Sequence, residues 1–124
     1  MSNQENNIIT INQWFQKKKK AEFSLPDRHF GKPCDYFFTL EKIYMSSENL
    51  HLEFDTNINF IFSGKVTVQE NDNKLEISSF NHLVFTWEDF SAKEIHLEEY
   101  FEGKVIFMPD PYTEIHSSWN RQLF

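Results

Sequence analysis

Glycine and cysteine are both scarce in this sequence, and each shortage limits what the chain can be. Only three glycines occur among the 124 residues, so tight turns must use Asn, Asp and Ser, the other residue types that favour turns. Cys34 is the only cysteine, which excludes an intramolecular disulfide and favours a reducing compartment. We therefore expect a cytoplasmic protein.

Long apolar runs and functional motifs are also missing. The longest apolar runs contain only a few residues, whereas a helix needs about 20 to cross a bilayer. The N-terminus lacks the basic-then-apolar order of a secretion signal. No catalytic, metal or nucleotide motif stands out, so we expect no enzyme, no cofactor, no bound metal and no membrane association.

Apolar residues are plentiful enough for one core, since 40% of the chain is hydrophobic and fourteen residues are phenylalanine. This length and composition predict a single domain over residues 1–124. Residues 1–7 are polar and are expected to be disordered. A short helix is expected over residues 10–20, because Thr10 and Gln13 have the spacing of a capping box and apolar residues follow at helical offsets.

Alternating apolar and polar residues dominate the stretch from Thr39 to Met108. In residues 50–55, for example, alternation puts successive side chains on opposite faces of a strand. The joints between such runs are mostly of hairpin length, which favours sequential antiparallel neighbours. The expected strands are about Tyr36 to Met45, Leu50 to Asp55, Ile58 to Phe62, Lys65 to Glu70, Lys74 to Ser78, His82 to Trp87, Glu94 to Tyr100 and Lys104 to Met108.

The predicted fold class is therefore mainly β. An antiparallel meander of seven to eight strands over residues 36–108 is expected to curl into a barrel-like or two-layer sheet, because an open sheet of this size leaves edges exposed. Residues 23–33 hold two prolines and a glycine and are expected to form a loop. Residues 109–124 begin with a proline that ends the last strand, and this C-terminal tail is expected to pack on the body.

Two short motifs carry a resemblance. Gly31-Lys32-Pro33-Cys34-Asp35 precedes the predicted strands, and Phe80-Asn81-His82-Leu83-Val84-Phe85-Thr86-Trp87 comes late among them. This arrangement resembles small uncharacterised bacterial β-rich proteins with a Gly-basic-Pro-x-Asp loop and a late Phe-x-x-Leu-x-Phe-x-Trp strand. The resemblance covers about residues 25–108 and implies an all-β fold. It implies no activity and no functional residues.

Three local patterns raise chemical hypotheses. His51-Leu52-Glu53 and His96-Leu97-Glu98 each place His and Glu on one face of a strand with Leu pointing inward, which suits a divalent metal but equally suits a solvated face. We favour the solvated face and predict no metal site.

The loop before the strands holds Asp27, His29, Cys34 and Asp35, which together suggest a cysteine nucleophile with a histidine base. We favour a structural role instead, in which Asp35 and Arg28 bind backbone groups and Phe30 anchors the loop. The aromatic strand around Trp87 raises a third hypothesis, a cavity for an apolar ligand inside a barrel, although side chains usually fill small barrels.

Charge is the most uneven property of the chain. Residues 1–34 contain six basic and three acidic side chains, whereas residues 35–110 contain five and fifteen. Such a field repels phosphate backbones and attracts basic proteins. Nucleic-acid binding is therefore disfavoured, and a basic protein partner is expected. The side chains predicted to form the partner-binding face are Glu53, Asp55, Glu76, Glu88, Asp89 and Glu98, with His51 and His96 beside them.

These observations lead to one functional hypothesis and two alternatives. We expect a non-catalytic acidic protein-binding domain, most specifically a bacterial immunity-type inhibitor that neutralises a basic toxin such as a nuclease. The first alternative is a small apolar-ligand carrier that uses a barrel interior, and the second is a domain with a structural or interaction role. The sequence leaves the partner's identity and the oligomeric state open.

Overall fold

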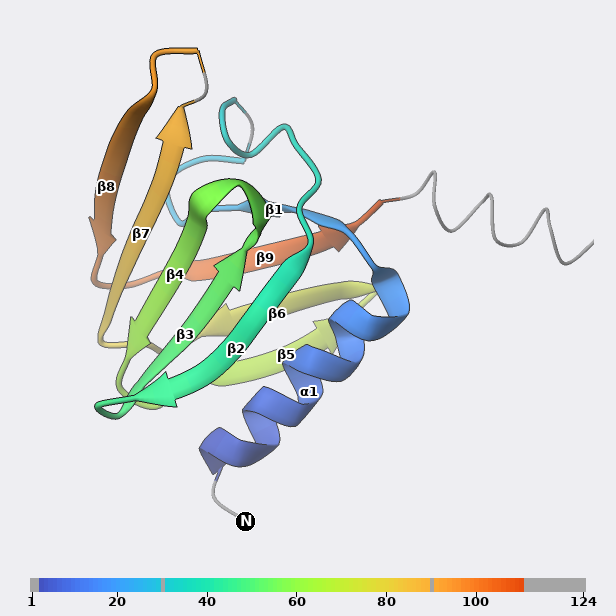
Figure 1. Ribbon diagram of the computed structural model, residues 1–124. Helices are drawn as coiled ribbons and strands as arrows, with labels where there is room; N and C mark the ends of the chain where they lie inside the picture. Colours follow the sequence, from blue (N-terminus) through green and yellow to red (C-terminus); the bar gives the residue numbers. More distant parts are fainter. Residues whose placement is uncertain (1–2, 30, 90, 111–124) are drawn as a thin grey trace, which may run out of the picture.

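The computed structural model describes residues 3–29, 31–89 and 91–110 (Figure 1). These residues form one helix, α1 (Asn3–Lys18), nine strands and a short 3₁₀ turn, η1 (Asp55–Asn57). The strands are β1 (Ala21–Ser24), β2 (Leu40–Ser46), β3 (Asn49–Phe54), β4 (Ile58–Ser63), β5 (Thr67–Asn71), β6 (Lys74–Ser78), β7 (His82–Asp89), β8 (Glu94–Tyr100) and β9 (Lys104–Pro109). The mainly-β prediction is confirmed.

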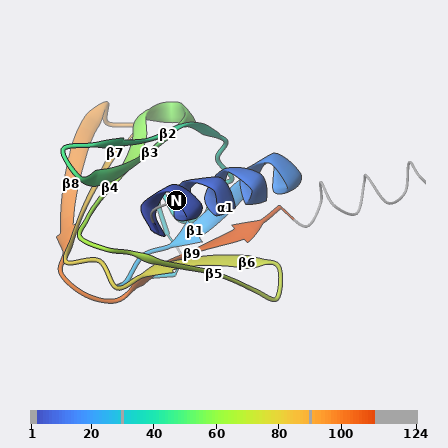
Figure 2. The ribbon, with the colours of Figure 1, turned by 90° about the horizontal axis from the view of Figure 1, so that it is seen from below.

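The strands are arranged in two antiparallel sheets. One sheet has the order β1-β9-β6-β5 and the other has the order β2-β3-β4-β7-β8. Seen from below, the two sheets form two layers with α1 between them on one side (Figure 2). The two-layer alternative is therefore the observed one, and the strands of the described residues do not close into a barrel. The meander is also interrupted, because the chain changes sheet after β1, β4, β6 and β8.

The helix is longer at its start than the sequence suggested. It begins at Asn3, so the expected disorder is wrong for residues 3–7, and Thr10 lies inside the helix instead of capping it. Tertiary contacts fix the first turns: the Gln4 side chain donates a hydrogen bond to the Gly64 carbonyl at 3.2 Å, and Asn7 donates one to the Val66 carbonyl at 3.0 Å. Local propensity does not reveal such contacts.

Helix α1 closes one side of the sandwich by packing against β2 and β5, the neighbouring edges of the two sheets (Figure 2). Its apolar stripe is buried, with Ile11 and Trp14 fully inaccessible. The ring of Phe15 lies 5.4 Å from that of Phe54 in β3 and 5.3 Å from that of Phe107 in β9. One side chain of the helix thus joins the two layers.

The core between the layers is filled by phenyl rings. Phe60 lies at its centre, with ring centroids of Phe85 at 4.7 Å, Phe23 at 5.1 Å and Phe107 at 5.5 Å. All four side chains are fully buried. Their tilted and edge-to-face contacts are the arrangements that aromatic pairs prefer. This packing occupies the space that an internal ligand would need.

The strands differ from the sequence prediction mainly at two places. No strand was predicted at β1, whose last two residues fall in the expected loop, but Ala21 and Phe23 point inward and the strand pairs with β9. Four residues between a lysine run and a proline are too few for a clear period-two signal. Strand β2 begins at Leu40 instead of Tyr36, because the segment before it makes only an isolated bridge, from Phe38 to Ala21.

Turns use few glycines, as expected. Nine residues other than glycine have a positive φ in the described part of the chain. Five are the expected Asn, Asp or Ser, and the others are Lys19, Glu48, Thr56 and Lys93. Gly103, at φ +100°, is a position that needs glycine, because an added Cβ would lie 2.7 Å from the Pro26 Cβ.

Within the described residues, the one helix is too short and too polar to cross a bilayer. Strand β9 ends at Pro109, as expected from the proline there. The predicted packing of the tail concerns residues 111–124, which lie outside the described residues.

Candidate functional site

The outward side of the five-stranded sheet holds part of the predicted partner-binding face. In β3, Leu50, Leu52 and Phe54 are buried, so His51 and Glu53 point outward as predicted. Strand pairing places two outward rows across the sheet. One row is Tyr44, His51, Ile61, Val84 and Glu99, and the other is Lys42, Glu53, Asn59, Thr86 and Leu97. We call these two rows, with His82, Glu88, Ile95 and Phe101, the outer face.

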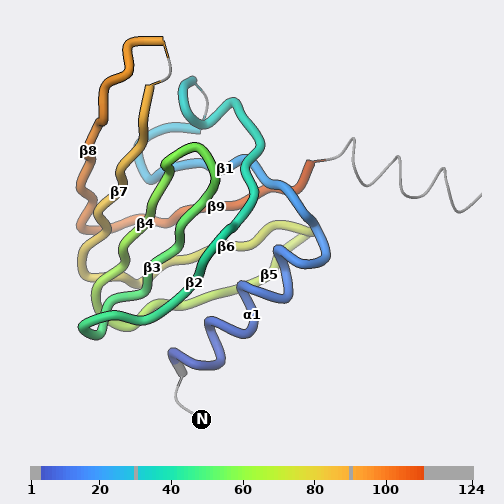
Figure 3. Tube along the Cα trace, in the orientation of Figure 1, coloured from blue at the N-terminus to red at the C-terminus, as the bar shows by residue number. Residues whose placement is uncertain are grey.

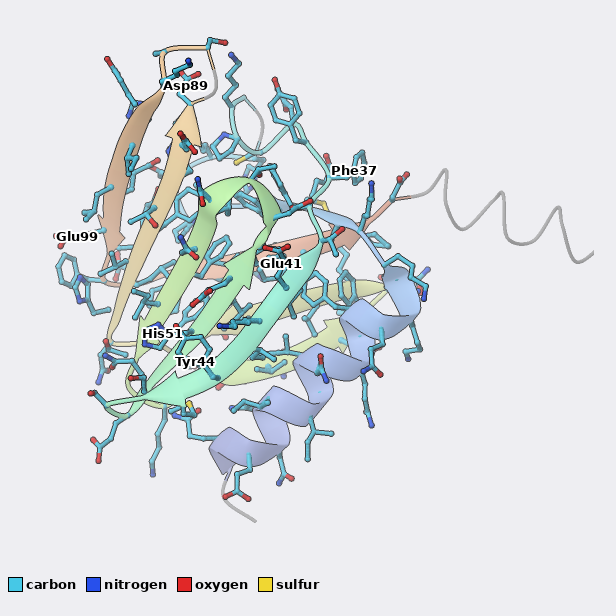
Figure 4. All side chains as sticks on the ribbon, viewed as in Figure 1. Phe37, Glu41, Tyr44, His51, Asp89 and Glu99 are labelled. Carbon is cyan, nitrogen blue, oxygen red and sulfur yellow. The ribbon has the colours of Figure 1, made fainter. Side chains whose placement is uncertain are left out.

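The β2–β3 end of the outer face is polar and ordered by side-chain contacts. The ring of Tyr44 stacks on that of His51 at 4.7 Å, and both point toward the viewer in Figure 4. The Tyr44 hydroxyl donates a hydrogen bond to Glu53 Oε2, and this bond raises the pKa of Tyr44. A shallow hollow lies here, with Asn59 and Thr86 also in its wall.

The β8 end of the outer face is apolar, which reverses the sequence prediction. Leu97 was expected to point inward, yet it is 61% exposed, and Ile95 on the same side is 76% exposed. Phe101, just after the strand, is 67% exposed. The register explains the reversal: Glu98 is paired with the buried Phe85, so Glu98 lies on the inner side of the sheet and Leu97 on the outer side.

On the inner side of the sheet, the Glu98 carboxylate forms an ion pair with Arg28. Arg28 donates two hydrogen bonds to the Glu98 carboxylate, at 2.5 and 2.7 Å. Trp87 Nε1 donates a third at 2.7 Å, and the Tyr100 hydroxyl lies 2.9 Å from both Glu98 and Asp27. The bond from Arg28 is the main reason that the pKa of Glu98 lies below its ordinary value. Glu98 is therefore a clamp between the loop and the β7–β8 hairpin, and its carboxylate is not free for a partner.

His96 also lies on the inner side, where its ring stacks on Trp87 at 4.4 Å. The two His-x-Glu pairs therefore occupy opposite faces of the sheet, and β4 and β7 separate their strands. They cannot bind one ion together. No cluster of three or more His, Cys, Asp or Glu suited to a metal occurs in the part of the chain that the structure describes.

The remaining predicted carboxylates occupy three different places. Glu88 lies on the outer face and accepts a hydrogen bond from Asn57 at 2.6 Å. Asp55, in η1, accepts one from the Thr39 backbone at 3.1 Å. Asp89, labelled near the top of Figure 4, accepts one from the Ser91 backbone at 2.9 Å. Glu76 lies in the other sheet, where Lys104 Nζ is 3.1 Å from its carboxylate.

The structure thus brings together His51, Glu53 and Glu88, and it separates Glu76, Glu98 and His96 from them. Sequence reasoning missed several members of the outer face, including Tyr44, Glu99 and Phe101. The His82 ring stacks on Phe101 at 4.7 Å, and its Nε2 lies 3.8 Å from Glu99 Oε1. In the sequence, Ile95 and Leu97 alternate with His and Glu, which shows that β8 is a strand but does not show which side is covered.

The loop that suggested a cysteine nucleophile makes contacts that hold its own turn and the β7–β8 hairpin in place. Cys34 is buried, and burial raises the pKa of its thiol, which disfavours the thiolate needed for attack. Asp35 accepts a hydrogen bond from the Gly31 backbone at 2.9 Å, as predicted, and the Arg28 side chain bonds to the Glu98 carboxylate. His29 is exposed. The predicted anchor, Phe30, lies outside the described residues.

A cleft of about 250 Å³, which we call the rim cleft, lies between the segment of residues 32–38, η1 and the end of β7. Figure 3 shows this segment passing close to the tip of the β7–β8 hairpin. The cleft walls include Tyr36, Phe37, Ile58 and Trp87, with Asp89 among the polar groups. The cleft is a surface feature, separate from the filled core.

Comparison of the chain with protein-family models, with curated proteins and with solved structures found no match.

Proposed function

We propose that this chain is a non-catalytic acidic protein-binding domain and, most specifically, a bacterial immunity-type inhibitor that neutralises a basic toxin such as a nuclease. One observation carries the proposal. The outer face combines strongly exposed apolar side chains, Ile95, Leu97 and Phe101, with the carboxylates Glu53, Glu88 and Glu99.

The apolar side chains supply the first argument. A protein surface normally has scattered single apolar residues, whereas a contiguous group of them marks a contact site. On the outer face, Ile95 and Leu97 lie two residues apart on one side of β8, and Val84 in β7, which pairs with Glu99, is a diagonal neighbour of Leu97. An interface with an apolar centre and a polar rim has this composition.

Charge supplies the second argument and indicates the kind of partner. The outer face holds three carboxylates, and its only lysine, Lys42, lies opposite Glu53 in the register. The surrounding segment of residues 35–110 carries fifteen acidic side chains against five basic ones. A face of this sign accelerates encounters with basic proteins and disfavours nucleic acid.

Rigidity supplies the third argument. An inhibitor gains affinity when its face is already formed before binding, because less conformational entropy is lost. Here the core beneath the face is filled by phenyl rings, and the Arg28–Glu98 clamp fixes the β7–β8 hairpin that carries the apolar side chains. The face is thus suited to covering a partner's surface.

A small apolar-ligand carrier is less well supported. Ligand pockets are mostly apolar and usually measure about 300–1,000 Å³. The rim cleft measures about 250 Å³ and includes charged side chains in its walls, and the larger hollow on the outer face, of about 480 Å³, is lined mainly by polar side chains. The interior that the carrier hypothesis requires is occupied by buried phenylalanines.

The proposal can be tested with affinity-tagged full-length protein in extracts of the source organism. We expect it to retain a basic protein at about 50 mM salt and to release it at about 500 mM, because salt screens exposed charges. The variant Glu88→Lys/Glu99→Lys should lose that protein. The control Glu70→Lys/Asp72→Lys makes the same change of charge at the β5–β6 turn and should keep it.

The retained protein is then purified and assayed alone. If it is a toxin such as a nuclease, a single equivalent of this chain should abolish its activity. Retention that is equal in the two charge variants, or a retained protein whose activity is unchanged by the chain, would contradict the proposal.

A further inference from the structure

The four sheet edges of this fold are not equivalent. Edges β2 and β5 are flanked by α1. The outer edge of β1 is bridged by Phe38, which exchanges two backbone hydrogen bonds with Ala21, at 2.8 and 3.0 Å. The fourth edge, β8, has β7 on one side and, among the described residues, no strand on the other (Figure 1).

Strand β8 lacks most of the features that normally protect an edge. Proteins block free edges with prolines, bulges, very short strands or charged side chains, especially lysines and inward-pointing charges; in β8 only the glutamates, including the inward-pointing Glu98, are of this kind. The sequence of β8, EIHLEEY, has seven residues with no proline, glycine or lysine. Its register with β7 is uninterrupted over seven residue pairs, whereas β2 has an irregularity between Leu40 and Lys42. Its backbone groups are therefore open to another strand.

Charge disfavours a second copy of this chain as the occupant. Strand β8 carries Glu94, Glu98 and Glu99 and no Lys or Arg, and Glu102 follows it. Two such edges pairing with each other would bring acidic side chains into adjacent positions, which is unfavourable. An extended segment with basic side chains is complementary to the same edge.

We propose that the free edge of β8 binds an extended basic segment of the partner protein by strand addition, so that the five-stranded sheet gains a sixth strand. This inference rests on the proposed function and specifies how the outer face is used. The added strand would hydrogen-bond to the β8 backbone, apolar side chains on its outward side would contact Ile95 and Leu97, and a basic side chain would lie beside Glu99.

A short peptide tests this mode without the natural partner. The probe is an N-acetylated, C-amidated peptide of sequence Lys-Lys-Thr-Ile-Thr-Val-Lys, labelled for fluorescence anisotropy, in which the second, fourth and sixth side chains (Lys, Ile and Val) share one side of the strand. Its control has the same sequence with the three central backbone amides N-methylated, which keeps the charge and the side chains but removes three hydrogen-bond donors. We expect the control to bind at least about tenfold more weakly, the effect of losing roughly 1.4 kcal/mol of hydrogen bonding.

Variants and hydrogen exchange locate the binding site. The variant Ile95→Lys/Leu97→Lys should weaken binding of the unmethylated peptide at least about tenfold, whereas Thr67→Lys/Gln69→Lys, with the same charge change on the β5 edge, should not. The bound peptide should slow amide exchange at alternate residues of β8, whose backbone N–H groups point away from β7 toward the added strand.

Equal binding of the two peptides, slowed exchange at another edge, or no binding of the unmethylated peptide at low salt would each overturn strand addition. None of these outcomes would overturn the proposed function, which is judged on the natural partner and the Glu88→Lys/Glu99→Lys variant. The Glu88→Lys/Glu99→Lys variant could lose the natural partner while the peptide does not bind to β8. In that case the outer face binds the partner, but without strand addition.

Discussion

Glu98 shows how one residue can be acidic, partly accessible and still unavailable for a partner. Its carboxylate accepts hydrogen bonds from Arg28 and Trp87, and the Tyr100 hydroxyl lies within hydrogen-bond distance of it. Charged pairs of this bidentate geometry are stronger than neutral hydrogen bonds. The residue joins the loop of residues 25–28 to the β7–β8 hairpin, so its contribution is to the shape of the outer face.

Replacing Glu98 tests this clamp. We expect Glu98→Gln to lower the free energy of unfolding by about 2 kcal/mol at pH 7, because Arg28 loses its charged partner in a partly buried site. The matched control, Glu99→Gln, changes an exposed carboxylate on the opposite side of the strand and should cost less than about 0.5 kcal/mol. Urea denaturation of both variants measures the difference.

The same variant should reveal a pH dependence. The pKa of Glu98 lies below its ordinary value of 4.5, chiefly because of the bond from Arg28. A carboxylate with a lowered folded pKa contributes its full stability above the unfolded pKa and loses it as the pH falls through the folded value. The stability difference between wild type and Glu98→Gln should therefore be constant above about pH 5 and shrink toward pH 3. A difference that does not change with pH would mean that the clamp is not ionic.

At the scale of elements, the end of α1 departs from the usual design. Lys19 follows the helix with φ at 71°, and its backbone N–H bonds to the Phe15 carbonyl at 2.9 Å. Glycine is the usual residue at this place, since side chains other than glycine are strained there.

Substitution at this helix end should therefore stabilise the protein. We expect Lys19→Gly to raise the free energy of unfolding by roughly 0.5–1 kcal/mol. The control Lys17→Gly, two residues earlier inside the exposed last turn, should lower it by roughly the same amount, because glycine weakens a helix interior. Thermal denaturation of the two variants would contradict this account if both changes had the same sign.

The elements that the sequence predicted well are those with their own local signal. Eight strands were expected, and eight correspond to β2–β9, because short turns such as Asp72-Asn73 separate clear alternating runs. Strand β1 was not predicted, because it is four residues long and depends on pairing with β9. The first turns of α1 were not predicted, because Gln4 and Asn7 bind a segment about 60 residues away.

The candidate site was predicted less well than the fold, for a related reason. Alternation in residues 94–100 identifies two sides of β8 but does not identify the covered one. Arg28 decides it, since its charge draws Glu98 inward and leaves Leu97 outward. The contact joins residues 70 positions apart, so no local pattern contains it. In β3, where Leu52 and Phe54 meet the core directly, the sides were predicted correctly.

At the scale of the whole molecule, binding and folding draw on different surfaces. The core holds the two sheets together, whereas Ile95 and Leu97 contribute little to it because they are mostly exposed. We therefore expect Ile95→Lys/Leu97→Lys to change the free energy of unfolding by less than about 0.5 kcal/mol per substitution while abolishing retention of the basic partner. A large loss of stability, seen by urea denaturation, would show that these side chains serve the fold instead.

The most direct test of the central claim, that the outer face binds a basic protein, is site-specific cross-linking in the source organism. A photoreactive benzoylphenylalanine is placed at position 97 on the outer face or, as a control, at the exposed position 69 in β5. We predict a single adduct with a basic protein from position 97, none from position 69, and loss of the adduct when Glu88 and Glu99 are changed to Lys. An adduct from position 69 alone, or one from position 97 that survives the charge reversal, would contradict the claim.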